Sequence, residues 1–241
     1  MATINDLLLA RNARKGHKTG DKAGAHSRIQ LTRYIARNCK LYDALTAHLF
    51  HPDHHPVLVD THPAIEVARH LERLGWVKNP APHTWLLACD DECRVYLAGG
   101  WLEEYSFLAH EAAGVDEIYF GQEIVWSVNG IDGKNEIDVI ARRGDLLSFT
   151  SCKAIRPDKS ANHTSELRDF LTETSYWNSH FANGSGRTLL ITTADMVDEE
   201  QGFRQRYPQL LARASILHVD VSGYEELEWN RLLETIENHW D

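Results

Sequence analysis

Three strand-like segments follow one another closely in the second half of the chain. They cover residues 117–128, 136–142 and 146–153, and glycine-containing turns at 129–134 and 143–145 join them. Connections this short are typical of hairpins, because a crossover between parallel strands needs a dozen or more residues. The sequence therefore predicts a hairpin-rich sheet in this region.

The elements around these strands indicate the fold class. One helix is expected before the hairpins, and strands alternate with helices after them. The expected helices cover 101–113, 164–181, 203–214 and the C-terminus, and the later strands cover 188–193 and 216–221. Strands that are separated by helices usually pair in parallel. We therefore predict an α/β fold in which helices flank a mixed sheet.

The first 98 residues have a different pattern and read as mainly helical. A helix is expected over Pro63–Gly75, because proline fits the first turn of a helix. Segments 84–88 and 94–98 look like two strands joined by an acidic turn, and a helix followed by a hairpin resembles a small winged-helix element. We expect a smaller N-terminal region at 1–98 and a second domain at 99–241.

Composition limits the setting in which the chain works. The hydrophobic share of 43% is ordinary for a soluble globular protein. No apolar run is long enough to cross a bilayer, and the first residues lack the pattern of a secretion signal, so we expect a cytoplasmic protein without membrane contact. Four cysteines at Cys39, Cys89, Cys93 and Cys152 form no CxxC pair. In this setting they are expected to be free thiols.

Basic residues are concentrated near the N-terminus, although the net charge of −10 argues against a protein that coats nucleic acid. Nine basic residues and one acidic residue lie between positions 11 and 40. This stretch is a candidate arm for contacting phosphates, and Arg28, Arg33 and Arg37 are its candidate nucleic-acid-binding residues. A solvated helical face beside a loop rich in glycine and lysine would give the same pattern, so both interpretations stay open.

Two of the strand segments carry charged residues at a spacing of two. Glu136 and Asp138 lie on one segment, and Ser151 and Lys153 lie on the next. Side chains two apart on a strand point to the same face. If the short turn at 143–145 pairs these strands, two carboxylates and an ammonium group converge on one patch.

Hydrolysis of a phosphodiester bond needs this combination of groups. Carboxylate oxygens hold Mg²⁺ or Mn²⁺, and the metal polarises the phosphate and lowers the pKa of a bound water. A lysine can orient that water or offset charge on the phosphorus. The alternative is that Glu136 and Asp138 are exposed positions of an amphipathic strand and that Lys153 is its charged end. The occurrence of both segments, in order, across one hairpin favours a metal-dependent endonuclease.

Three ordered motifs carry a resemblance to a known family. They are Gly99–Tyr105 (GGWLEEY), Asn135–Val139 (NEIDV) and Phe149–Lys153 (FTSCK). Asp138 followed across a hairpin by Lys153 resembles the PD-(D/E)xK nuclease signature. Together the motifs are similar to the nuclease half of the CRISPR-associated CARF-nuclease effectors, from about Gly99 to Val221.

The resemblance implies a restriction-endonuclease-like fold and a nuclease that cuts DNA or RNA with Mg²⁺ or Mn²⁺ in antiviral defence. It also implies a homodimer that is activated by cyclic oligoadenylate, bound by a sensor domain. Asp138 would be the central metal ligand, Lys153 the lysine of the signature, and Glu103 the carboxylate of the preceding helix. Glu104 is the alternative to Glu103, because adjacent helical residues point about 100° apart and only one can face the site.

The chain departs from the family pattern in two places. Ser151 stands where the signature usually has Asp or Glu, and a serine holds a divalent cation poorly. Either Glu136 substitutes as a ligand, or the protein is an inactive nucleic-acid-binding or regulatory protein on the same fold. In addition, the first hundred residues do not read as a full sensor domain. Either the nuclease stands alone, or another chain supplies its sensor, or the basic N-terminal region regulates it.

Histidines and tryptophans offer two further candidates. A metal site formed by His48, His51, His54, His55 and His62 is weighed against surface loop histidines. Base stacking by tryptophan, with Trp177 beside Tyr176 as the best case, is weighed against burial in the core. In both cases the sequence favours the structural alternative.

Overall fold

A computed structural model describes residues 2–40, 42, 57–58, 62–88, 91–155, 163–198 and 202–241. The histidines at 48, 51, 54 and 55 and the side chain of His62 lie outside the described residues, as does Cys89. Within the described part of the chain, no helix is long and apolar enough to cross a membrane.

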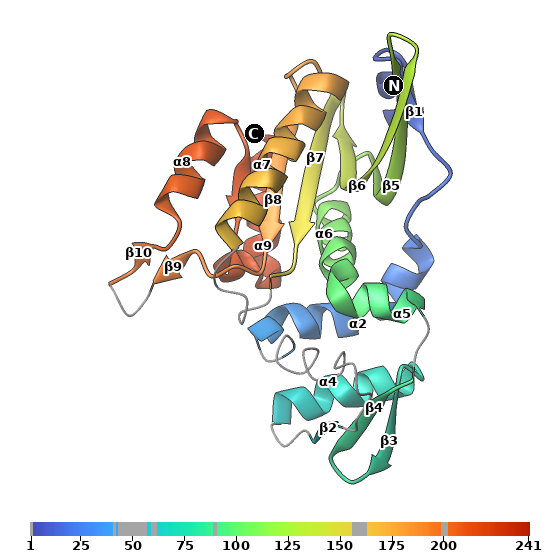
Figure 1. Ribbon diagram of the computed structural model, residues 1–241, viewed down its shortest axis with the longest axis vertical. Helices are drawn as coiled ribbons and strands as arrows, with labels where there is room; N and C mark the ends of the chain where they lie inside the picture. Colours follow the sequence, from blue (N-terminus) through green and yellow to red (C-terminus); the bar gives the residue numbers. More distant parts are fainter. Residues whose placement is uncertain are drawn as a thin grey trace.

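A six-stranded mixed sheet forms the centre of the fold (Figure 1). In sheet order its strands are β1 (Ala13–Lys15), β5 (Glu117–Val128), β6 (Ile131–Arg143), β7 (Leu146–Lys153), β8 (Arg187–Thr192) and β11 (Asp220–Ser222). The first four pair antiparallel, and β8 and β11 are parallel to β7 and to β8 respectively. The prediction of an α/β fold with a mixed sheet is confirmed.

Helices cover both faces of this sheet. Helices α6 (Trp101–Ala112) and α9 (Trp229–Trp240) pack against one face with apolar side chains such as Leu102 and Leu232. Helices α7 (His163–Phe181) and α8 (Pro208–Ile216) pack against the other face, where α7 crosses in front of β7 and β8 in Figure 1. The apolar cores on the two faces fix the sheet between helical layers.

The N-terminal segment also belongs to this sheet. Helix α1 (Ile4–Leu9) precedes β1, and Ala13 of β1 pairs with Trp126 of β5. Helix α2 (Lys22–Arg37) then packs on α6, with Ile35 fully buried in the same core. The sheet therefore includes a strand from the region 1–98. This strand was not predicted, because three residues give too short a pattern to detect.

A second, three-stranded antiparallel sheet follows α2. Its order is β2 (Val57–Leu58), β4 (Thr84–Leu87) and β3 (Val77–Ala81), and helix α4 (His62–Arg73) precedes the β3–β4 hairpin. The expected strand at 94–98 is wrong, because α5 (Asp91–Val95) and the π-helical turn η1 (Tyr96–Gly100) occupy that stretch. A helix followed by a hairpin is present, in which β4 confirms the expected strand at 84–88 and β3 is its partner in place of 94–98.

Smaller elements complete the C-terminal half. A two-stranded ribbon of β9 (Val197–Asp198) and β10 (Arg204–Gln205) precedes α8, and the 3₁₀ turn η2 (Tyr224–Glu226) precedes α9. Helix α8 starts later than expected because Pro208 occupies its first turn. Cys152 is a thiol as predicted. Cys93 is disulfide-bonded, so the prediction of free thiols is wrong there.

Candidate active site

The candidate site lies where β6 and β7 separate. Their pairing ends with Val139 opposite Thr150. At the next position the backbone N–H of Cys152 donates to the carboxylate Oδ2 of Asp138 over 2.7 Å. The side chain of Asp138 therefore takes the place of a backbone partner in the ladder, and its carboxylate is fixed at the point of divergence.

The strict alternation of side chains breaks at Asp138. Ile137 packs in the core on the α7 side of the sheet, whereas Val139 packs in the core on the α6 side. The rule that side chains two apart on a strand point to the same face therefore does not hold for Ile137 and Val139. The neighbouring strand has Gly121 between the residues that pair with them, and its φ of +51° is a conformation that favours glycine. The irregular pairing at Gly121 changes the direction of the backbone at Asp138, which lies between a residue of one core and a residue of the other.

Glu103 on α6 faces this point. Burial raises its pKa to about 8, and repulsion from Asp138 and then Glu136 adds to the shift. Burial also raises the pKa of Asp138 to about 6, opposed by the hydrogen bond from Cys152 and reinforced by repulsion from Glu173 and Glu136. The carboxylates that the sequence singled out are thus close enough to perturb one another.

The adjacent residue, Glu104, has a different role. Its carboxylate accepts two hydrogen bonds from Arg28, at 3.2 Å from Nε and 2.5 Å from Nη2. Both side chains are nearly buried, with exposed fractions of 7% for Glu104 and 14% for Arg28. Of the two candidates, the structure therefore turns Glu103 toward Asp138 and holds Glu104 against α2.

Lys153 and Ser151 point toward α7. The ammonium of Lys153 lies 4.7 Å from the ring centre of Phe170, and its charge lowers the pKa of Asp138. The hydroxyl of Ser151 accepts a hydrogen bond from Thr174 over 2.9 Å and is buried. Lys153 thus interacts electrostatically with Asp138 from the α7 side of the sheet, whereas Glu103 is on α6.

Two charged residues near the site were not selected from the sequence. Glu173 on α7 raises the pKa of Asp138 and accepts a hydrogen bond from Asn135 over 2.6 Å. Lys18, between β1 and α2, forms an ion pair with Glu136 and lowers the pKa of Glu103. Both come from segments that are distant in sequence, so local spacing gave no signal for them.

The donor set suits a hard divalent cation. Glu103, Glu136 and Asp138 offer carboxylate oxygens, which Mg²⁺ and Mn²⁺ prefer. The ammonium of Lys18 already provides a cation against Glu136. Among the described residues, no three acidic, histidine or cysteine side chains lie close enough together to hold one metal ion. Because Mg²⁺ keeps several waters and needs only one or two carboxylates, the donor chemistry still fits it.

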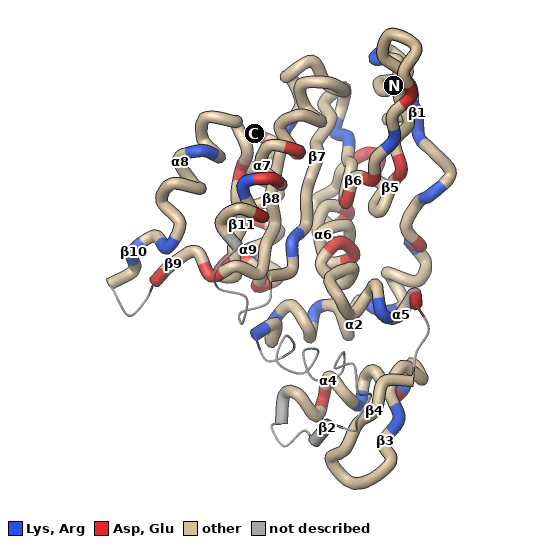
Figure 2. The backbone as a smooth tube through the Cα atoms, in the orientation of Figure 1, with Lys and Arg blue, Asp and Glu red and all other residues tan. Residues whose placement is uncertain are grey.

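The three arginines of the expected arm have different surroundings, although basic residues are spaced along α2 (Figure 2). Arg28 is committed to Glu104, which argues against contact with phosphate. Arg33 lies 4.4 Å from the ring centre of Trp229. Arg37 is exposed and lines a hollow of about 590 Å³. The other basic residues of that hollow are Lys40, Arg206 and Arg231. Among these three arginines, Arg37 is the exposed one and lines this hollow.

A smaller hollow of about 220 Å³ opens beside the carboxylates. Lys18, Glu103 and Glu136 line it together with the rings of Trp76 and Tyr96. It connects the N-terminal segment, η1 and the sheet at the candidate site. A phosphate group that approached Glu103 and Glu136 from this side would meet Lys18.

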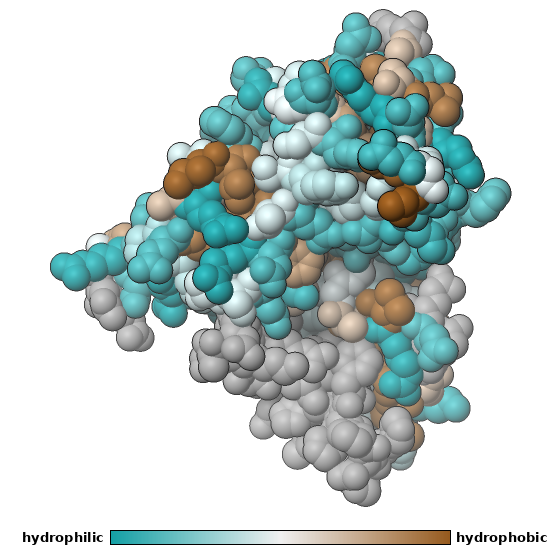
Figure 3. Space-filling view, turned by 45° about the horizontal axis from the view of Figure 1, so that its top comes forward, coloured by the Kyte–Doolittle hydropathy of each residue, from teal (hydrophilic) through white to brown (hydrophobic). Residues whose placement is uncertain are grey.

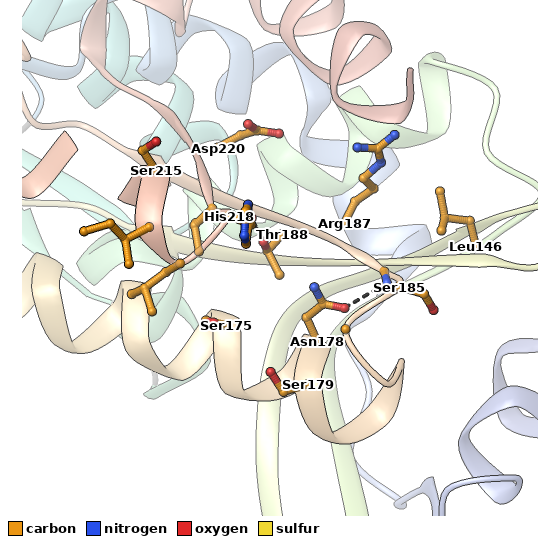
Figure 4. Close-up of a pocket in the computed structure, with 15 residues that line it drawn as sticks. Leu146, Ser175, Asn178, Ser179, Ser185, Arg187, Thr188, Ser215, His218 and Asp220 are labelled. Carbon is orange, nitrogen blue, oxygen red and sulfur yellow. Dashed lines mark hydrogen bonds between the residues drawn. The ribbon is translucent and has the colours of Figure 1, made fainter. Parts of the chain in front are cut away.

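A larger hollow of about 760 Å³ lies at the other end of the sheet (Figure 4). Arg187 at the start of β8 lines it and pairs with Ser148, whereas Lys153 pairs with Thr192 at the end of β8. The hollow contains none of the candidate site residues. An apolar patch interrupts the mainly hydrophilic face in Figure 3, and Ile216 beside this hollow is 77% exposed.

The tryptophan weighed as the best candidate for base stacking is buried. Trp177 is 4% exposed and stacks on Phe181 with an interplanar angle of 8°. Its neighbour Tyr176 is 46% exposed and lines an open hollow with Trp126. The structural interpretation of Trp177 is therefore correct.

Comparison with known proteins adds evidence on the fold. No protein-family profile and no curated protein matches the chain. The solved structure of protein VC1899 from Vibrio cholerae aligns with 99% of this chain and 62% of its own, with a TM-score of 0.69 and 15% identity. Can2 from Sulfobacillus thermosulfidooxidans, solved in complex with cyclic tetra-adenylate, aligns with 98% of this chain and 61% of its own, with a TM-score of 0.62 and 14% identity. The chain thus shares their fold and spans about three fifths of their length.

Proposed function

We propose that this chain is a metal-dependent nuclease that hydrolyses phosphodiester bonds of DNA or RNA. The observation that carries the proposal is the cluster at the divergence of β6 and β7. There, repulsion from Asp138 adds to the effect of burial in raising the pKa of Glu103, Glu136 raises the pKa of both carboxylates, and Lys153 lowers the pKa of Asp138. Such crowding of carboxylates is typical of a site that binds a cation and performs catalysis.

Each residue has a proposed part in the reaction. One or two of the carboxylates Asp138, Glu136 and Glu103 would hold Mg²⁺ or Mn²⁺ together with water, and the hydrogen bond from Cys152 keeps Asp138 oriented. The metal, when bound, supplies Lewis-acid activation of the phosphate and of a water. Lys153 offsets the charge that develops on the phosphate or orients the attacking water. Glu173 is a further carboxylate on the α7 side, where Ser151 provides none.

We also propose a role in CRISPR-linked antiviral defence in the cytoplasm. The support is the resemblance of the three motifs to the CARF-nuclease effectors, together with the fold shared with Can2, whose structure contains cyclic tetra-adenylate. Cyclic oligoadenylate, bound by a separate sensor chain or region, is the proposed activator, and a homodimer is the proposed assembly. The chain spans 61% of Can2. The activator is therefore proposed for this chain and is not carried over from Can2 as a finding.

A second candidate is a nucleic-acid-binding protein that has lost catalysis. Ser151 favours it, because this position in the signature usually carries a metal-binding carboxylate. The ion pair of Lys18 with Glu136 also favours it, since it places an ammonium group of the protein against a proposed ligand. This candidate predicts salt-sensitive binding without cleavage.

The decisive experiment incubates the protein with supercoiled plasmid, single-stranded DNA and single-stranded RNA in Mg²⁺, Mn²⁺ or EDTA. The Asp138→Ala and Lys153→Ala variants are run beside it, each with and without cyclic oligoadenylate. Cleavage that needs metal and is lost in both variants is expected. Retained activity in Asp138→Ala would refute the nuclease proposal, and binding without cleavage under every condition would favour the second candidate.

A further inference from the structure

The segment that carries Lys18 is fixed along β5 by backbone hydrogen bonds. Gly16 donates to the carbonyl of Glu123 over 2.7 Å, and Gly20 donates to the carbonyl of Phe120 over 2.7 Å. Between them, the carbonyl of Lys18 accepts from the backbone N–H of Glu123 over 2.9 Å and from the side-chain Nε2 of Gln122 over 3.0 Å. The backbone at Lys18 is therefore positioned by the sheet.

Glycine allows this segment to approach the sheet closely. A Cβ atom added at Gly20 would lie 2.4 Å from a ring carbon of Phe120, which is closer than such atoms can come. On β5, Gly121 faces both the backbone of Gly20 and the carboxylate of Glu136. The absence of a side chain at Gly20 thus lets the segment that carries Lys18 lie against β5.

The ammonium of Lys18 is the counter-charge paired with Glu136 on this side of the carboxylate cluster. It pairs with Glu136, and its charge lowers the pKa of Glu103 against burial and repulsion. The Lys18 side chain is 64% exposed and that of Glu136 is 36% exposed. Ion pairs with this exposure are weak and are exchanged readily. A divalent cation can therefore compete with the ammonium for Glu136.

We propose that Lys18 is a tethered counter-cation of the carboxylate cluster. It neutralises Glu136 in the metal-free protein and yields this carboxylate to a divalent metal ion. Because its backbone stays fixed on β5, the released ammonium remains at the mouth of the 220 Å³ hollow, where it contacts a phosphate of the substrate. This inference rests on the proposed nuclease function and adds a positioning residue to it.

The first test measures metal binding without nucleic acid. Full-length protein is titrated with Mn²⁺, and free Mn²⁺ is followed by electron paramagnetic resonance for the wild type, Lys18→Ala and Lys22→Ala. Lys22, four residues after Lys18, is the matched control. Its ammonium lies 4.5 Å from the ring centre of Tyr119. Removing the competing charge is expected to tighten Mn²⁺ binding in Lys18→Ala by up to about fivefold. Lys22→Ala is expected to match the wild type.

The outcomes separate this inference from the proposed function. Equal Mn²⁺ affinity in Lys18→Ala and the wild type, with binding lost in Asp138→Ala, would refute the role of Lys18 and leave the metal site standing. No Mn²⁺ binding in any variant would refute both. Circular dichroism and the melting temperature would verify that each variant is folded, which is expected because Lys18 is exposed.

The second test measures the contact with phosphate. Binding of single-stranded DNA is followed against salt concentration in Ca²⁺, with the same three proteins. Loss of one phosphate contact reduces the slope of log K against log salt by about 0.7. Lys18→Ala is expected to show this reduction and Lys22→Ala is not. An unchanged slope in Lys18→Ala would overturn the phosphate contact.

Discussion

Replacing Arg28 by alanine is expected to destabilise the protein strongly. The guanidinium makes two charge-assisted hydrogen bonds to Glu104, and both side chains are nearly buried. It also lies 5.4 Å and 5.8 Å from the ring centres of Tyr96 and Trp76. In Arg28→Ala the carboxylate of Glu104 would keep its burial and lose these bonds.

The size of the effect follows from this burial. Breaking a buried ion pair by removing one partner costs about 3–5 kcal/mol. The exposed fraction of 14% at Arg28 places the expected loss near the lower end, at about 3 kcal/mol. This loss changes the unfolding equilibrium constant about a hundredfold. It lowers the melting temperature by about 6–12 °C for a chain of this length.

Urea denaturation of Arg28→Ala, followed by far-ultraviolet circular dichroism, would measure this loss. Arg37→Ala is the matched control on the same helix, because Arg37 is exposed and should change the unfolding free energy by less than about 0.5 kcal/mol. The double replacement Arg28→Met with Glu104→Leu should restore much of the stability, since an apolar pair often replaces a buried ion pair without loss. If Arg28→Ala unfolded like Arg37→Ala, the structural role assigned to Arg28 would be refuted.

Three further predictions concern other charged residues. In metal-free protein, the free energy of unfolding should fall as pH rises from about 4.5 to 8, because folded Glu103 retains a proton that the unfolded chain releases. Thermal denaturation in EDTA would measure this fall, and a flat profile would contradict the raised pKa. His239→Ala should cost about 1–3 kcal/mol in urea denaturation. The reason is that the His239 ring bonds Ser148 at 2.9 Å and Asp220 at 2.6 Å, and unchanged stability would argue against this network. Arg37→Ala should reduce the salt slope of nucleic-acid binding by about 0.7–0.9 if the residue contacts one phosphate. The same slope as the wild type would show that Arg37 contacts no phosphate.

The part of the fold that sequence could predict is the part governed by local pattern. The hairpins of β5, β6 and β7 were recognisable because short glycine turns and strand-forming residues lie in one continuous stretch. The prediction of a strand at 94–98 was wrong, because Val95, Tyr96 and Leu97 suit a strand as well as a buried helical turn. Packing of Tyr96 and Leu97 in the core decided for the helix. Local propensity is a weak guide where tertiary packing competes with it.

In the candidate site, too, the residues that could be predicted are those linked by local spacing or by the family pattern. Asp138 and Lys153 lie on adjacent strands of one hairpin, so their spacing alone brings them near each other. Glu103 comes from the helix before the sheet, and the family pattern pointed to it. Glu173 and Lys18 come from segments whose position depends on the whole fold. No spacing rule in the sequence connects either of them with Asp138.

The charge balance of the site depends on both halves of the chain. Lys18 neutralises Glu136. Arg28 pairs with Glu104, whereas Glu103 is the residue whose pKa is raised by repulsion from Asp138. Strand β1 covers the edge of β5 opposite the proposed ligands. All three features precede Gly99, where the resemblance to known nucleases begins. A fragment starting there would expose the edge of β5 and remove two cations from a group of neighbouring carboxylates. The N-terminal segment is therefore an electrostatic part of the proposed site, and a domain boundary at Gly99 would divide it.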